Sequence, residues 1–304
     1  MLLLDTASLY FRAFYGLPDS LKAPDGTVVN AVRGLLEFIT RLTSEYDPAY
    51  LVCCWDNNWR PTWRVGLLPE YKAHRVSHQD PGGGDEEDMP AELRQQIPII
   101  KQVLEAVGIA VVGVDDYEAD DVVASLSARA PEGVDIATGD RDLFQLVDDS
   151  AHVRVLYTAR GVKAHEVITE AEVKQRFGIE AARYVDFAVL RGDPSDGIPG
   201  VRGIGDKTAA KLLNEYGDLQ AILAAVDDPS TGLSPRQREN LNAARDYIHA
   251  AQQVVRVVDN LQISHDLQDL RRPRRFARPN RVAELAQTFG LGGSVDRLEQ
   301  ALGT

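Results

Sequence analysis

Acidic residues follow short apolar runs at three places in the chain. The runs occupy residues 2–4, 51–55 and 134–138, and the acids that follow them are Asp5, Asp56, Asp140 and Asp142. Short apolar runs bounded by turns are typical of buried strands in a parallel sheet. Ligands of open α/β sheets bind beyond the carboxyl ends of the strands. If these runs are neighbouring strands, we expect their carboxylates to meet in one crevice.

Two more acidic clusters lie further along the chain. The first is YEADD, with Glu118, Asp120 and Asp121, and the second is GDPSD, with Asp193 and Asp196. Carboxylates gathered in one pocket need cations to offset their repulsion. All-oxygen ligation suits hard divalent cations, so the pattern predicts Mg²⁺ or Mn²⁺.

The overall charge limits the kind of nucleic-acid protein that this chain can be. Its 304 residues carry a formal net charge of −13, and the isoelectric point is about 4.9. Such acidity argues against a passive basic coat on nucleic acid. It is compatible with a nucleic-acid enzyme, because bound metal ions would neutralise part of the acidic site.

The cysteines and the apolar segments indicate a cytoplasmic protein. Cys53 and Cys54 are adjacent on a predicted strand, so they point to opposite faces and read as two small buried residues. No disulfide framework is evident, which fits a reducing compartment. No apolar stretch approaches the roughly 18 residues that suggest a membrane span, so we expect no membrane contact.

The pattern of elements predicts an α/β protein with a twisted, mostly parallel sheet flanked by helices. Strand-like runs alternate with helical patterns over residues 1–160, and the helical patterns lie near 29–46, 91–107 and 119–130. After residue 160 we expect the strands to cease and helices to dominate to about residue 265. The pairs Thr169–Glu172 and Ser234–Gln237 read as capping boxes there. Residues 266–304 form a C-terminal extension.

An acidic, glycine-rich segment interrupts the α/β region. PGGGDEED, residues 81–88, lies within a stretch of about 70–92 that we interpret as an arch or lid, the alternative being a plain surface loop.

A glycine hairpin is the second clear sequence signal. Gly203 and Gly205 flank Ile204, and a helix is predicted from Asp206 onward. Backbone N–H groups at such a hairpin and helix start suit a phosphate ligand. Lys207 and Lys211 are placed where they would also reach phosphates. The alternative is an ordinary hairpin between two helices.

In order and spacing, three motifs resemble the 5′ nuclease (flap endonuclease) family, as found in the 5′→3′ exonuclease domain of bacterial DNA polymerase I. They are YEADDV at 117–122, TGDRDLFQLV at 138–147 and RGDPSDGIPGVRGIGDKTAAKLL at 191–213. The resemblance covers about residues 1–265. It implies a PIN-like sheet, a helical arch, and a helix–hairpin–helix element near 185–217. The acidic insertion departs from the family's commonly proline-rich arch.

The resemblance also implies roles for individual residues. Direct or water-mediated metal ligands would be Asp5, Asp56, Glu118, Asp120, Asp140, Asp142, Asp193 and Asp196, with Asp121 either in the same set or in an outer shell. Lys72 and Arg75 would hold the scissile phosphate. Tyr71 would either stack on a terminal base or pack beneath the loop. DNA-backbone contacts are expected from the hairpin residues Val201, Gly203 and Gly205, with Lys207 and Lys211.

By the same resemblance, the reaction is hydrolysis of DNA phosphodiesters with two or three Mg²⁺ or Mn²⁺ ions. A K⁺ ion is expected at the hairpin. The substrate would be DNA with a 5′ flap, a nick or a free 5′ end, and the products would carry 5′-phosphate and 3′-hydroxyl groups. We expect a monomer that acts in replication and repair, with a DNA polymerase and a ligase as separate partners. Two alternatives stay open at this point: a Toprim-like metal enzyme and a non-catalytic DNA-binding module.

Overall fold

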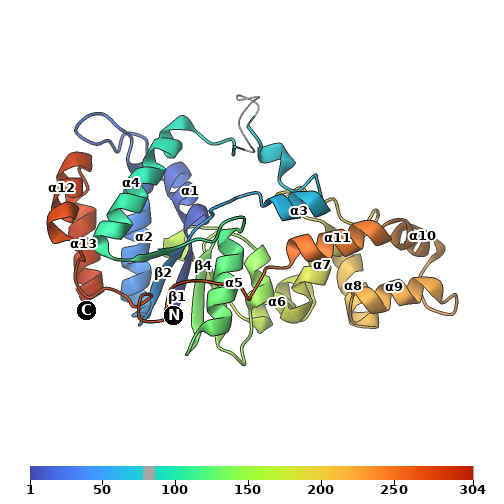
Figure 1. Ribbon diagram of the computed structural model, residues 1–304. Coiled ribbons are helices and arrows are strands. Elements are labelled where there is room, and N and C mark those ends of the chain that lie inside the picture. Colours follow the sequence, from blue (N-terminus) through green and yellow to red (C-terminus); the bar gives the residue numbers. More distant parts are fainter. Residues whose placement is uncertain (78–85, 304) are drawn as a thin grey trace.

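A parallel sheet forms the centre of the computed structural model, which describes residues 1–77 and 86–303 (Figure 1). Within those ranges the sheet has six strands in the order β3-β2-β1-β4-β5-β6. The strands are β1 (Leu2–Asp5), β2 (Leu51–Cys54), β3 (Ala110–Val112), β4 (Val134–Thr138), β5 (Val153–Tyr157) and β6 (Glu166–Ile168). β1 to β5 pair in parallel, and only β6 runs antiparallel to its neighbour. The predicted fold class is confirmed.

The strand register brings the acidic residues to one edge of the sheet. β1 lies between β2 and β4, with Asp5 opposite Cys54 and Leu4 opposite Ala137. Asp5, Asp56 and Asp140 therefore follow three adjacent strands at their carboxyl ends, as the apolar runs predicted. The central strands are buried on both faces, and Cys53 and Cys54 belong to the two different cores.

Helices cover both faces of the sheet and extend beyond it. One core includes residues of α1 (Thr6–Gly16), α2 (Asn30–Tyr46), α4 (Ala91–Val107), α12 (Pro279–Phe289) and α13 (Gly292–Gly303). The other includes residues of α5 (Ala119–Arg129), α6 (Glu170–Phe177), α7 (Tyr184–Arg191), α8 (Asp206–Tyr216), α9 (Leu219–Asp227), α10 (Pro235–Ala243) and α11 (Arg245–Val255). α3 (Thr62–Leu67) contacts α11. Figure 1 shows α8 to α11 projecting beyond the sheet.

Short 3₁₀ helices join several of these elements. They are η1 (Ala73–Arg75), η2 (Asp142–Leu146), η3 (Val162–Ala164) and η4 (Ala181–Arg183). Among the described residues, no helix is long and apolar enough to cross a membrane.

Two details of the region after residue 160 differ from the prediction. Strands do not cease there, because β6 adds a three-residue antiparallel edge. Thr169 begins α6, but its hydroxyl bonds the Glu172 carboxylate instead of a backbone N–H, so that capping box does not form. The box of Ser234 and Gln237 does form at the start of α10.

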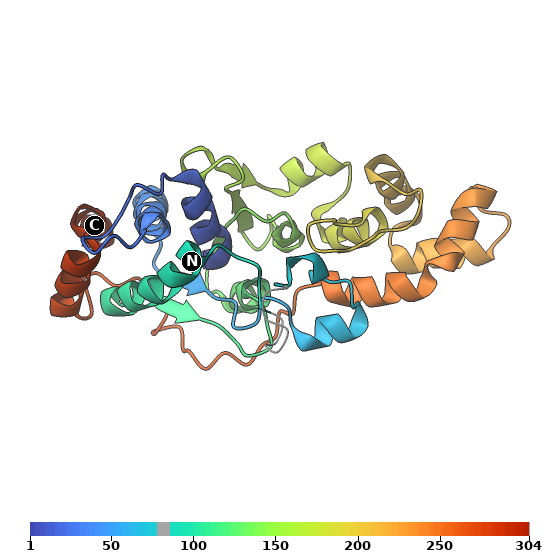
Figure 2. The same cartoon turned by 90° about the horizontal axis from the view of Figure 1, so that it is seen from above.

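The C-terminal extension is part of the folded body. α13 packs against α2, and α12 packs against α4. The basic cluster before α12 is also integrated, since Arg272 is buried and pairs with Asp47 at 2.6 Å. α12 and α13 contribute to the same core as α2. They lie at the end of the molecule opposite the projecting α8–α11 segment (Figure 2).

Candidate active site

A polar pocket opens at the carboxyl ends of β1, β2 and β4. Its volume is about 420 Å³. Predicted acidic and basic site residues both line it. They are the acids Asp5, Asp56, Glu118, Asp120, Asp140 and Asp193, and the bases Lys72 and Arg75. The predicted crevice of converging carboxylates is therefore present.

Helix starts and neighbouring hydroxyls hold the two central carboxylates in place. Asp5 caps α1, where it accepts a bond from Ser8 N at 3.2 Å, and Thr138 Oγ1 donates to it at 2.6 Å. Asp56 accepts a bond from Ala119 N at 2.7 Å, at the start of α5. Helix N-termini favour negative charge, so the fold stabilises these anions while keeping them beside the pocket.

Asp140 and Asp142 lie on the turn that follows β4. Asp140 Oδ1 accepts a bond from Asp142 N at 2.9 Å. Gly139 allows this turn to approach α1, because a Cβ there would lie 2.9 Å from Ser8 Oγ. Asp142 Oδ1 is buried and has no hydrogen-bond partner among the described residues. A buried acceptor without a donor is costly, and a cation would satisfy it.

Burial and mutual repulsion raise the pKa values of Asp5, Asp120 and Asp142. Burial, with the nearby charge of Asp56, raises the pKa of Asp5 to about 7. Burial, followed by the charge of Asp5, raises the pKa of Asp120 well above its ordinary value. The pKa of Asp142 is raised in the same way by burial and by Asp140. The site therefore resists holding all its negative charge without added cations.

These raised pKa values predict how stability depends on pH. A carboxyl whose pKa is higher in the folded state binds a proton more tightly there, so ionising it destabilises the fold. The free energy of unfolding of the metal-free protein should lose this contribution as pH rises from about 4 toward 7, the window set by Asp5. Asp25 and Asp116, whose pKa values are lowered, act in the opposite direction.

The metal-dependent difference isolates the effect of the pocket. The increase in melting temperature on adding Mg²⁺ or Mn²⁺ to chelated protein should be small near pH 4.5 and grow toward pH 7.5. Thermal unfolding with and without chelator across this range measures it. An increase of constant size at every pH would contradict the assignment of these carboxyls to an ion site.

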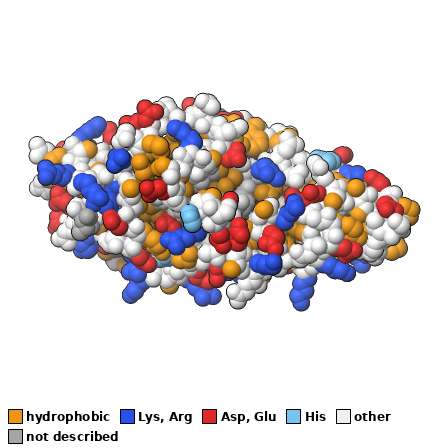
Figure 3. All heavy atoms as spheres, turned by 90° about the horizontal axis from the view of Figure 1, so that it is seen from below, with side chains coloured by type: hydrophobic (Ala, Val, Ile, Leu, Met, Phe, Trp, Pro, Cys, Tyr) orange, Lys and Arg blue, Asp and Glu red, His pale blue; other side chains and the backbone are white. Residues whose placement is uncertain are grey.

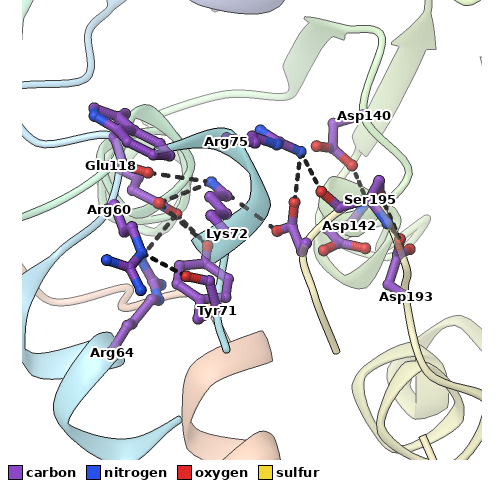
Figure 4. Close-up of polar contacts among 12 residues, drawn as sticks. Arg60, Arg64, Tyr71, Lys72, Arg75, Glu118, Asp140, Asp142, Asp193 and Ser195 are labelled. Carbon is purple, nitrogen blue, oxygen red and sulfur yellow. Dashed lines mark hydrogen bonds and ion pairs between the residues drawn. The ribbon is translucent and has the colours of Figure 1, made fainter. Parts of the chain in front are cut away.

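Three side chains converge on Glu118 (Figure 4). Lys72 Nζ pairs with its carboxylate at 2.8 Å, Tyr71 Oη donates at 2.8 Å, and Arg64 Nη1 lies at 3.1 Å. Tyr71 is only 4% exposed. Of the two interpretations of Tyr71, these contacts favour packing beneath the loop over stacking on a terminal base, because its ring is enclosed and its hydroxyl is occupied.

Asp121 is held on the side of α5 away from the pocket. It is fully buried, pairs with Arg64 at 2.7 and 2.8 Å, and accepts bonds from Val258 N and Glu118 N. These four donors occupy its oxygens, and the residue does not line the pocket. These contacts favour the outer-shell role of Asp121 over direct ligation of an ion.

The GDPSD loop connects the pocket to the base of the arch. Arg75 Nη2 bonds Asp196 Oδ1 at 2.8 Å and Ser195 O at 2.6 Å. Lys72 N donates to Asp196 O at 2.9 Å. Gly197 makes this approach possible, because a Cβ there would lie 2.4 Å from Glu70 O. Asp193 accepts bonds from Ser195 and Arg191.

The glycine hairpin follows that loop and leads into α8. Gly203 has a positive φ of 75°, and Gly205 is exposed with open space where a Cβ would stand. Lys207 and Lys211 are exposed one turn apart on α8. Val201 differs, because its side chain is 3% exposed and packs in the core. A DNA contact at Val201, which stays a prediction, would therefore be made through its backbone.

Three residues of this site were missed by sequence reasoning. Arg64 reads as a surface base but is buried between Glu118 and Asp121. Arg141 lines the pocket between the two acids of DRD, a position that the motif itself could have signalled. Glu87, in the acidic arch segment, also lines the pocket, a position that its membership of PGGGDEED did not indicate. Residues 78–85, which include most of PGGGDEED, lie outside the described residues.

The donor set fits hard divalent cations in its chemistry. Its ligand candidates are carboxylates, the pKa values of Asp120 and Asp142 are raised by burial, and Asp142 Oδ1 lacks a donor. As the side chains stand, Lys72 pairs with Glu118 and Arg75 with Asp196. Within residues 1–77 and 86–303, no three His, Cys, Asp or Glu side chains are placed to ligate one ion together.

Comparisons with known proteins agree with this architecture. Residues 1–178 match the family described as "5'-3' exonuclease, N-terminal resolvase-like domain", and residues 179–277 match "5'-3' exonuclease, C-terminal SAM fold". A 5′-3′ exonuclease of Streptomyces coelicolor is 55% identical over 98% of both chains. One of Mycobacterium tuberculosis is 46% identical over 100% of this chain and 98% of the relative.

Solved structures share the fold at low identity. The T5 D15 flap endonuclease, in a complex with DNA and metal ions, has a TM-score of 0.67 and 18% identity over 99% of this chain and 97% of the other. The catalytic core of Rad2 with DNA substrate has a TM-score of 0.61 and 16% identity over 99% and 92%. The matches favour the nuclease over both the Toprim-like enzyme and the non-catalytic module. The chain belongs to the 5′-3′ exonuclease family.

Proposed function

We propose that this chain is a metal-dependent, structure-specific 5′ nuclease. Its substrate is DNA with a 5′ flap, a nick or a free 5′ end, and its products carry 5′-phosphate and 3′-hydroxyl groups. One observation carries the proposal: a single pocket holds seven carboxylates with Lys72 and Arg75, and the loop bearing Asp193 continues into the glycine hairpin. Complexes of the T5 and Rad2 nucleases with DNA support the choice of substrate.

Two or three Mg²⁺ or Mn²⁺ ions are the proposed cofactors. Asp5, Asp56, Glu118, Asp120, Asp140, Asp142, Asp193 and Asp196 would hold them, directly or through water. Bound there, such ions lower the pKa of a coordinated water and stabilise charge on the leaving oxygen. The T5 enzyme with bound metal ions supports this proposal.

Lys72 and Arg75 are the proposed phosphate-binding residues. Each is paired with a pocket carboxylate, Lys72 with Glu118 and Arg75 with Asp196. Lys72 also has a positive φ of 50°, a conformation that a non-glycine residue keeps only where its surroundings enforce it. The two bases therefore stand at the pocket before substrate arrives. With ions held by Glu118 and Asp196, both bases would be available to offset charge on the phosphoryl oxygens.

The hairpin is proposed to hold the duplex at a fixed distance from the pocket. Gly203 and Gly205 leave the backbone open to a phosphate, and Lys207 and Lys211 add charge on the same side. A K⁺ ion bridging the hairpin to a phosphate would fit there. Because such contacts are to the DNA backbone, selectivity should be for structure, and binding should weaken with salt.

The wider setting follows from the relatives. DNA polymerase I of Mycobacterium bovis is 41% identical over 79% of this chain, which is only 26% of that polymerase. We propose that a separate DNA polymerase and a ligase act beside this protein in replication and repair. The chain would work as a cytoplasmic monomer.

A cleavage assay tests the proposed function. A duplex with a 5′-labelled flap is incubated with protein and Mg²⁺ or Mn²⁺, and in parallel with excess chelator. We expect labelled products only with metal, and a ligatable 5′-phosphate on the trimmed duplex. Specific binding of the flap without metal-dependent product would instead identify a non-catalytic DNA-binding module.

We expect the negative charge of Glu87, which lines the pocket, to repel phosphates and so weaken DNA binding. Residues 75–77 and 86–88 pair through a bridge between Val76 and Glu87, which directs Glu87 toward Arg75 and Asp56. Its carboxylate competes with a phosphate for Arg75. We therefore expect Glu87→Gln to lower the Kd for flap DNA by roughly threefold to tenfold, the effect of one unscreened charge at this range. Fluorescence anisotropy in chelator measures the Kd.

Asp88→Asn is the matched control for that change. It removes the same charge one residue away, at an exposed position that does not line the pocket. The Kd of Asp88→Asn should stay near that of the wild type. An equal gain in both variants would show that general acidity of the segment, and not the position of Glu87, opposes DNA.

A further inference from the structure

A groove next to the active-site pocket combines aromatic and basic side chains. Its volume is about 800 Å³, and it runs between α1, α2 and η3. We call it the α1–η3 groove and define it by Phe11, Arg12, Tyr15, Phe38, Arg160 and Lys163. Among the residues that the structure describes, three bases and no acid line it, although the chain as a whole carries a net charge of −13. The groove therefore suits an anionic ligand with flat apolar parts.

Tyr15 gives the groove an exposed stacking surface. Its side chain is 70% exposed, more than any other large hydrophobic residue that the structure describes. Its ring stacks on Phe11 with centroids 6.5 Å apart and planes 14° apart. Phe14 braces it edge-on at 5.2 Å. An aromatic ring held in this way loses little freedom when a ligand stacks on it.

The basic residues surround that ring without closing the groove. Arg12 donates to Ala159 O at 2.8 Å, and its buried Nε has no partner among the described residues. Arg160 and Lys163 are exposed on the opposite wall. Away from this side, on the face seen in Figure 3, basic and acidic side chains are interspersed. Among the described residues, no acid of the groove itself opposes these cations, although Arg160 Nε lies 4.0 Å from Glu166 Oε1 outside the groove.

The groove is continuous with the active-site pocket. Ser8 and Phe11 line both hollows. Figure 2 shows dark-blue α1 on one side of this region and the yellow α7–α8 segment, which carries the hairpin, on the other. A DNA strand that crosses the pocket from the hairpin therefore arrives at Tyr15.

We propose that the α1–η3 groove binds an unpaired stretch of the substrate strand, with a base stacked on Tyr15 and phosphates against Arg160 and Lys163. Single-stranded DNA is commonly held by such a pairing of aromatic platforms and basic walls. This inference rests on the proposed function, because it assigns the groove to the same DNA substrate. It adds a preference for flaps whose nucleotides carry bases.

Flap substrates with and without bases test the stacking contact. One duplex carries a normal 5′ flap, and a second carries an otherwise identical flap of abasic nucleotides. Kd is measured in chelator by fluorescence anisotropy, and KM is measured with Mn²⁺. For the wild type we expect the abasic flap to raise both constants about tenfold, within the range for one stacked base. Tyr15→Ala should raise both about tenfold on the normal flap and show little further penalty on the abasic one.

Two variants sharpen the comparison. Tyr15→Phe keeps the ring and should behave like the wild type, whereas Val167→Ala removes an exposed apolar side chain on β6, outside the groove, and should change neither constant. Equal discrimination between the two flaps by the wild type and Tyr15→Ala would overturn the proposal. If binding follows the expectation but no DNA is cleaved, the proposed function fails and the groove stands. If DNA is cleaved without discrimination, only the groove fails.

Discussion

Asp120→Asn is expected to abolish cleavage while leaving DNA binding intact. Asp120 lines the pocket from the first turn of α5, and burial beside Asp5 raises its pKa well above the ordinary value. An amide of the same shape ligates a divalent cation more weakly and brings no negative charge. The cleavage rate should fall roughly a thousandfold, as several kcal/mol of lost charge stabilisation implies. Single-turnover cleavage of a flap duplex measures this rate.

The binding measurement separates this loss from a loss of structure. Contacts to the duplex are proposed at the hairpin, so the Kd for DNA in chelator should be that of the wild type or lower, because one pocket charge is gone. Asp246→Asn is the matched control, since Asp246 is exposed on α11 and does not line the pocket. Full cleavage by Asp120→Asn would remove this residue from the metal site.

Arg64→Met should destabilise the protein by about 3–5 kcal/mol, the usual effect of removing one partner of a buried ion pair. Arg64 is 1% exposed, and its guanidinium bonds both Asp121 and Glu118. Without it, buried Asp121 loses its two guanidinium contacts, and Glu118 keeps only Lys72 as a paired base. Urea unfolding monitored by circular dichroism measures the change in the free energy of unfolding.

Two further variants test the physical reason for that loss. Arg64→Met combined with Asp121→Asn should recover part of the stability, because one of the stranded charges is removed. Arg278→Met breaks the pair with Glu105, in which both side chains are more than 60% exposed, and should change stability by less than about 1 kcal/mol. A similar small effect for Arg64→Met would show that the buried pair does not support the α3–α5 contact.

Local sequence patterns were sufficient to locate the acids but not to orient them. Strand ends predicted the positions of Asp5, Asp56 and Asp140, because strands buried on both faces appear in the sequence as continuous apolar runs. Apolar runs do not show which of the adjacent residues Asp120 and Asp121 faces the pocket. Successive residues of a helix point about 100° apart, so only the packing of α5 decides which carboxylate faces the pocket and which faces Arg64.

Other features depend on contacts between distant segments. Arg64 and Val254 O, 190 positions apart, meet only in the folded chain. β6 escaped prediction because three residues, of which only Ile168 is buried, give no alternating pattern. The position of the Tyr71 ring depends on Glu118, which accepts a hydrogen bond from its hydroxyl and lies 47 residues further along the chain. In contrast, α12 and α13 bury Val282, Leu285 and Leu298 at helical spacing, a signal that the sequence did contain.

Direct titration of metal ions tests the central claim, that these carboxylates form a divalent-cation site. Isothermal titration of Mn²⁺ into chelator-treated protein at pH 7.5 gives the number and affinity of bound ions. The account predicts saturable binding of about two ions in the wild type and weaker binding of at least one of them in Asp120→Asn and in Asp142→Asn, with Asp246→Asn unchanged. Binding of the same number of ions with the same affinity in all four proteins would contradict it.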